Sequence, residues 1–139
     1  MFHWEWHKIE LDIGKLIIAD FGAGAVLITF GALLGKLNTF QLLAVACFEI
    51  FFYGLNEELG VQIFGGSDMG GSMYVHTFGA IFGVACAWIY RPKTNKVDDP
   101  KDSTLCGGNY YSNLIAFIGT IFLWMYWPSF NGALATNNA

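Results

Sequence analysis

The sequence predicts an all-α membrane protein with four transmembrane helices, and three observations support this fold class. Charged residues make up only 13% of the 139-residue chain, about half of their share in an ordinary soluble domain. Two long runs contain no Asp, Glu, Lys or Arg: 22 residues from Met69 to Tyr90, and 37 residues from Ser103 to the C-terminus. Apolar residues also continue around every face of the expected helices, unlike the single stripe of a soluble helix.

A helix needs about 20 apolar residues to cross the hydrocarbon core of a bilayer, and four stretches of the chain meet this length. The first contains small residues from Gly22 to Ala25, which indicate tight packing against another helix. The alternating pattern of a membrane β-barrel strand is absent from all four. We expect the helices at about residues 14–35, 39–59, 67–90 and 112–134.

The positions of Lys and Arg predict the orientation of these helices. Lys36 follows the first helix, and four more basic residues lie in the segment 91–111 between the third and fourth helices. Five of the seven positive charges therefore fall on one side of the membrane. We expect the 91–111 loop to be cytosolic and both chain ends to lie outside, with Pro92 ending the third helix.

Composition excludes several other classes of protein. A net charge of -4 and a pI near 5.1 offer no basic surface for nucleic acid. Three cysteines, Cys47, Cys86 and Cys106, are too scattered for a disulfide framework or a metal knuckle, so we expect no metal and no cofactor. An intramembrane enzyme built on His76 and Asp68 lacks a second set of metal ligands or a nucleophile with its base, and we expect no enzymatic activity.

The third helix carries the polar residues of most interest. Asp68, Ser72 and His76 are spaced by four residues, which predicts one polar stripe on a helix. Asp68 either caps the helix start or handles substrate. His76 at membrane depth favours a role in a pore or a substrate site over simple packing. Gly79 and Gly83 continue the stripe and would let another backbone or a narrow passage come close.

Three further acids stand in or near the first two helices. Asp20 is predicted to be a helix cap or a packing hydrogen-bond partner. Glu49 lies in the middle of the second helix and is expected to bond a neighbour. Glu57, followed by Glu58, lies at the outer end of that helix, where an acidic mouth would attract small cations.

The fourth helix contains Pro128, which removes one backbone donor and predicts a kink or an end near Trp127. Phe130 and Asn131 would then stand at the outer membrane face. They either belong only to an interfacial aromatic belt with Trp124, Tyr126 and Trp127 or form part of a site.

Several blocks of this sequence resemble the Rh glycoprotein branch of the ammonium transporter superfamily. The blocks are ADFGAGAVLITFGALLGK, the NE of GLNEE, DMGGSMYVHTFGAIFG and IGTIFLWMYWPSFN. The last of these is the most specific to the Rh branch. The resemblance covers nearly all of the chain from about residue 16.

This resemblance implies a trimeric channel whose subunits have eleven or twelve helices in two inverted halves, with a narrow pore through each subunit. His76 matches the first of two paired pore histidines. Phe21 and Phe130 match the two phenylalanines that close the outer vestibule, and Asn131 follows this gate.

The same resemblance implies roles for the acids: Glu57 matches the vestibule acid, and Asp68 matches the acid at the start of the histidine helix. Asp68 is then expected to organise the vestibule and the helix start, while ammonium is drawn to the outer mouth. Ammonium would lose its proton near the gate and pass as neutral ammonia, because a bare cation is costly in hydrocarbon. Carbon dioxide is a second candidate substrate.

The resemblance also implies surroundings and partners: a multi-pass position in the lipid bilayer, with the plasma membrane expected, and a homotrimer or an Rh-family hetero-oligomer. Three earlier helices and the whole second half of such a channel are missing, so we expect the chain to be a partial sequence. The alternative is a small four-helix accessory or scaffolding subunit without transport activity.

Overall fold

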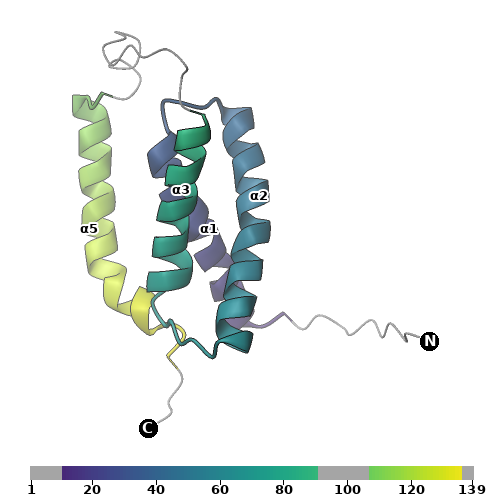
Figure 1. Cartoon of the computed structure of the whole chain (residues 1–139). Helices are drawn as coiled ribbons and strands as arrows, with labels where there is room; N and C mark the ends of the chain where they lie inside the picture. Colours follow the sequence, from purple (N-terminus) through teal and green to yellow (C-terminus); the bar gives the residue numbers. More distant parts are fainter. Residues whose placement is uncertain (1–10, 91–106, 136–139) are drawn as a thin grey trace.

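The computed structural model describes residues 11–90 and 107–135. Its helices run side by side along one axis, and α5 stands somewhat apart from the other three (Figure 1). Two π-helical segments, η1 and η2, continue α2 and lead into α3. The elements are α1 (Ile13–Leu33), α2 (Thr39–Glu58), η1 (Leu59–Ile63), η2 (Ser72–Thr77), α3 (Phe78–Ile89) and α5 (Tyr110–Gly132).

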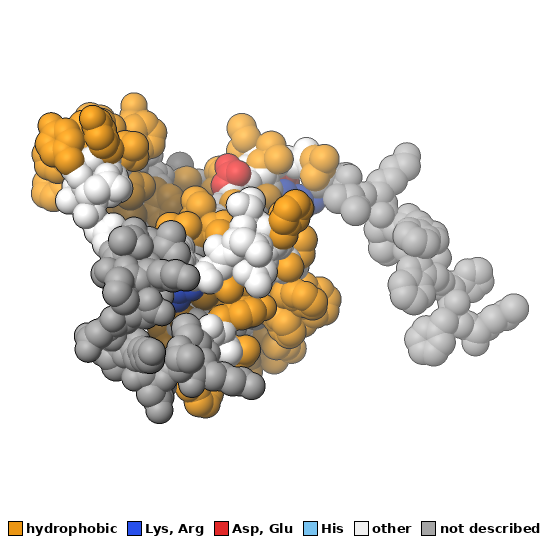
Figure 2. Space-filling view, turned by 90° about the horizontal axis from the view of Figure 1, so that it is seen from above, with side chains coloured by type: hydrophobic (Ala, Val, Ile, Leu, Met, Phe, Trp, Pro, Cys, Tyr) orange, Lys and Arg blue, Asp and Glu red, His pale blue; other side chains and the backbone are white. Residues whose placement is uncertain are grey.

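The described residues include four helical stretches that are long and apolar enough to cross a membrane. All four stretches carry large exposed hydrophobic side chains, for example Leu27, Ile81 and Phe122, as expected for helices that face lipid or other apolar helices. Seen from above, many hydrophobic side chains lie around the edge of the described part (Figure 2). The predicted all-α membrane fold is confirmed. The stretches are Ile13–Leu33, Thr39–Ile63, Ser72–Ile89 and Tyr110–Gly132.

Polar side chains at the helix starts explain where three of the helices begin. Asp12 caps α1 by accepting a hydrogen bond from the Lys15 backbone N–H at 2.7 Å. Asn38 caps α2 and Asn109 caps α5, each in a reciprocal capping box. The interpretation of Asp20 as a cap is therefore wrong: it lies exposed within α1, two turns after the residue that does cap the helix.

The third span begins later than predicted. Residues 64–71 are not helical, and Gly65 and Gly71 adopt φ values of +64° and +72°, a region that favours glycine. The helix therefore starts at Ser72 instead of about 67. The predicted stop at Pro92 and most of the 91–111 loop lie outside the described residues.

The core of the molecule is a close contact between α1 and α3. A Cβ placed on Gly79 would lie 2.7 Å from the Ala25 carbonyl oxygen, and one placed on Gly83 would lie 3.0 Å from the Thr29 Cα. Ala25 and Thr29 are fully buried there. The prediction that another backbone comes close at Gly79 and Gly83 is confirmed.

Helix α5 is attached mainly by its C-terminal end. It contains no buried residue, and Phe130 and Leu134 pack against the core cluster of Phe21, Ala25, Tyr53 and Val75. The helix does not end at Pro128 but continues to Gly132, and its yellow end bends toward α3 (Figure 1). The bend predicted from Pro128 brings Phe130 to the rest of the molecule.

The close contact between α1 and α3 can be tested by adding one methyl group, through a glycine-to-alanine substitution. We expect Gly79→Ala to lower the free energy of unfolding by about 1–3 kcal/mol, because the new methyl group would overpack against backbone. Gly31→Ala in α1 is the control, since nothing lies within 4 Å of its Cβ position. Thermal unfolding of the complete protein in detergent measures both, and equal midpoints for the two variants would contradict the close contact.

Candidate functional site

An aromatic cluster joins three elements at the bent end of α5. The rings of Phe21 in α1 and Phe130 in α5 have centroids 4.8 Å apart. Trp127 stacks on Phe130 with centroids 5.3 Å apart and an interplanar angle of 15°. The imidazole of His76 in η2 lies 6.2 Å from Phe130 and 5.9 Å from Trp127. The structure thus brings together the three predicted residues Phe21, His76 and Phe130.

His76 is the polar member of this cluster. Its Nε2 atom is buried and has no hydrogen-bond partner among the described residues. A neutral imidazole has one nitrogen that donates and one that accepts a hydrogen bond. His76 can therefore bond a small polar molecule that comes between these rings.

The π-helix η2 determines where His76 points. The His76 backbone N–H donates to the Gly71 carbonyl at 2.9 Å, with the five-residue separation of a π-helix. The Thr77 side-chain hydroxyl donates to the Ser72 carbonyl at 2.8 Å. Such wide turns are frequent at functional sites. The sequence contained no signal for this turn apart from the two glycines before it.

Asp68 anchors the start of η2. Its carboxylate accepts hydrogen bonds from the backbone N–H groups of Ser72 at 2.8 Å, Met73 at 2.7 Å and Tyr74 at 3.0 Å. The predicted stripe of Asp68, Ser72 and His76 is wrong, because Asp68 precedes the helix and η2 is wider than an α-helix. The capping interpretation of Asp68 is confirmed.

The other acids lie on two different elements. Glu57 is half-buried near the end of α2, where the Tyr53 hydroxyl forms a hydrogen bond with it. Asp68 is near enough to interact electrostatically with the same tyrosine, so Glu57 and Asp68 lie at one end of the molecule. Glu58 is exposed beside them, and Asp20 is exposed one residue before Phe21.

Asn131 connects α5 to the loop before η2. Its Nδ2 donates to the Trp127 carbonyl at 2.9 Å, and a Cβ placed on Gly70 would overlap its amide oxygen. Gly70 therefore gives Asn131 the space to approach this loop. Sequence reasoning missed Gly70, and it placed Trp127 only in an aromatic belt, although its three-residue spacing from Phe130 indicates a shared helix face.

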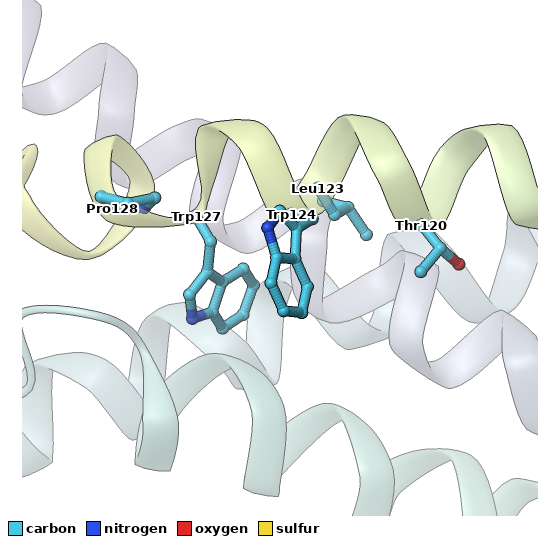
Figure 3. A pocket seen from close by; sticks show the side chains of 5 residues that line it. All are labelled: Thr120, Leu123, Trp124, Trp127 and Pro128. Carbon is cyan, nitrogen blue, oxygen red and sulfur yellow. The ribbon is translucent and has the colours of Figure 1, made fainter.

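An open apolar groove of about 550 Å³ runs along α5 from this cluster. In Figure 3 the indole rings of Trp124 and Trp127 both point from α5 toward the neighbouring helices. Because Trp127 also contacts His76, the groove and the aromatic cluster are continuous. The groove is lined by Thr120, Leu123, Trp124, Trp127 and Pro128.

Within residues 11–90 and 107–135, no group of three or more His, Cys, Asp or Glu side chains could hold a metal ion. Cys47 and Cys86 are free thiols, whereas Cys106 lies outside the described residues.

Comparison with known proteins identifies the family. A family model described as Ammonium Transporter Family matches residues 1–139. The chain belongs to the ammonium transporter family. This family is a class of transporters and channels, and the membrane position of the chain is multi-pass.

Relatives of Rh type confirm the branch of the ammonium transporter family that the sequence resembles. The chain is 47% identical over 135 residues to ammonium transporter Rh type B of Danio rerio, covering 96% of this chain and 28% of that protein. It is 45% identical over 130 residues to ammonium transporter Rh type C of Bos taurus, covering 93% of this chain and 27% of that protein. The chain thus spans little more than a quarter of the length of these relatives.

The anchoring role of Asp68 can be tested by its removal. We expect Asp68→Ala to lower the free energy of unfolding by about 1–3 kcal/mol, because three backbone N–H groups lose their acceptor. Glu58→Ala removes an exposed neighbouring acid and should change this free energy by no more than about 0.5 kcal/mol. Thermal unfolding in detergent compares the two, and an unchanged midpoint for Asp68→Ala would contradict the anchoring role.

Proposed function

We propose that this chain forms one side of the outer gate and upper pore of an Rh-type channel that conducts ammonium as ammonia. The observation that carries this proposal is the buried, unpartnered Nε2 of His76 directly behind the Phe21–Phe130 ring pair. The printed names of the relatives, ammonium transporters of Rh types B and C, support the choice of substrate.

Ammonium is attracted first to the acidic end of the molecule. Glu57 is the acid best suited to this step, since it is half-buried near the surface and its hydrogen-bond partner among the described residues is the Tyr53 hydroxyl. Asp20 adds a second negative charge beside Phe21. Asp68 is less available, because its carboxylate already accepts three backbone hydrogen bonds.

The ring pair then separates the charged from the neutral form. The faces of Phe21 and Phe130 can hold a cation by cation–π attraction, but passage of a bare cation through an apolar groove is costly. Ammonium therefore transfers its proton to water on the outer side of the rings, and neutral ammonia then passes inward and exchanges hydrogen bonds with His76. Asn131 keeps the end of α5 against the loop before η2 and thus maintains the gate.

The same apolar route would admit carbon dioxide, which is neutral and small. We propose that the complete protein assembles as a homotrimer, or as a hetero-oligomer with other Rh proteins, in the plasma membrane. The large exposed side chains of Phe40, Phe48 and Phe51 on α2 support a surface that lipid or another subunit covers.

Removal of the imidazole tests the pore role. In vesicles containing the complete protein, we expect His76→Ala to change ammonium-driven flux by about tenfold or more, since a buried hydrogen bond to the substrate is lost. Met73→Ala, an exposed position in the same π-helix, is the control and should conduct like the parent. Unchanged flux in His76→Ala would remove this residue from the pathway, and a parent protein without flux would favour an accessory subunit.

Removal of one gate ring tests the outer barrier. We expect Phe130→Ala to raise the flux of methylammonium relative to ammonium by about threefold or more, because the 4.8 Å ring contact with Phe21 is lost. Phe117→Ala is the control, since this ring is 62% exposed and lies more than three turns away on α5. Equal flux ratios for the parent and Phe130→Ala would show that this ring belongs only to an aromatic belt.

A further inference from the structure

A polar junction joins three helices within the apolar core. The Thr29 hydroxyl oxygen in α1 lies 2.6 Å from Glu49 Oε1 in α2 and 2.8 Å from the Gly79 carbonyl oxygen in α3. Thr29 and Glu49 are both fully buried, at 0% exposure. The prediction that Glu49 bonds a neighbour is confirmed, and the neighbour in turn reaches a third helix.

The number of hydrogens at this junction limits the state of Glu49. A threonine hydroxyl has one hydrogen to donate, and the Gly79 carbonyl can only accept. If Glu49 were ionised, both short contacts of the Thr29 oxygen would face acceptors and one would lack a hydrogen. A carboxylic acid O–H on Oε1 supplies the missing one, and 2.6 Å is a usual length for an O–H···O bond.

The surroundings of the second carboxylate oxygen of Glu49 also favour the neutral, protonated form. Glu49 Oε2 is buried and has no hydrogen-bond partner among the described residues. A neutral carbonyl oxygen can stay buried without a partner at a modest cost in free energy, whereas an unpaired buried charge costs far more. Of the lysines in the described part of the chain, Lys15 is exposed in the first turn of α1, and Lys36 Nζ bonds the Ala32 carbonyl beyond its end.

We propose that Glu49 is held as a neutral carboxylic acid that donates to Thr29, which donates to the Gly79 carbonyl. This chain of hydrogen bonds fastens α2 to α1 and α1 to α3 with each hydrogen used once. Phe21 is two turns before Thr29 in α1, and His76 is three residues before Gly79. Glu49 and Thr29 are thus positioning residues for the gate, a role that rests on the proposed function, whereas the protonation of Glu49 does not.

Infrared spectroscopy tests the protonation directly. The complete protein in lipid vesicles at neutral pH should show the C=O stretch of a protonated carboxylic acid. The band that belongs to Glu49 should be missing from the spectrum of the Glu49→Gln variant. Glu57→Gln is the control and should leave the band in place. If the parent and Glu49→Gln show the same protonated-carboxyl bands, Glu49 is ionised and the proposal is wrong, whether or not the protein conducts ammonium.

Flux measurements test the positioning role. Glu49→Gln keeps a hydrogen-bond donor at position 49, and Thr29→Ser keeps the hydroxyl at position 29. We therefore expect the flux ratio of methylammonium to ammonium in each variant to stay within about twofold of the parent. Thr29→Val and Glu49→Leu break the junction and should change this ratio by about threefold or more, about the effect of one hydrogen bond. A variant that only lowered the amount of folded protein would leave the ratio unchanged, and that result for both would overturn the positioning role. If Thr29→Val and Glu49→Leu fail to fold, the two conservative variants decide the question. A flux ratio in Thr29→Ser or Glu49→Gln that differs by more than about twofold from the parent would then overturn the positioning role.

Discussion

The close contact of α1 with α3 at Gly79 and Gly83 is the constraint on which the rest of the molecule depends. Lipid offers apolar helices no hydrophobic reason to associate, so small residues and polar bonds between helices decide their packing. Without a Cβ on Gly79, α1 approaches near enough for Thr29 to reach the Gly79 carbonyl. Glu49 then joins α2 to the same point. The three helices hold Phe21 and His76 as parts of one packed body.

Helix α5 contributes to the site by a different principle. Most of its length is exposed, and its C-terminal end, from Trp127 onward, packs against the other helices. Trp127, just before the bend at Pro128, contacts His76, and Phe130, just after it, contacts Phe21. The missing side chain of Gly70 leaves room for Asn131 beside the loop before η2. The aromatic cluster thus combines a firmly packed part, from α1 and η2, with a part from α5 that is attached near the cluster itself.

Two carboxylates at the same end of the molecule have different uses because their surroundings differ. Asp68 accepts three backbone N–H groups and holds the first turn of η2. Glu57 bonds the Tyr53 hydroxyl and stays half-buried, and in the proposed function its charge is the one that attracts a cation. Residue type and position along the chain are similar for both acids. Their difference lies in which backbone amides each carboxylate can reach.

Local features of the sequence were sufficient to predict the four spans, the close approach at Gly79 and the bend at Pro128. Bilayer thickness, the lack of a Cβ and the lack of a proline N–H act within a few residues, so the sequence alone reveals them. Tertiary structure decided the late start of the third span, the π-turn that carries His76 and the contact of His76 with Trp127. These depend on how each helix is rotated about its axis, and contacts between residues far apart in the chain determine that rotation.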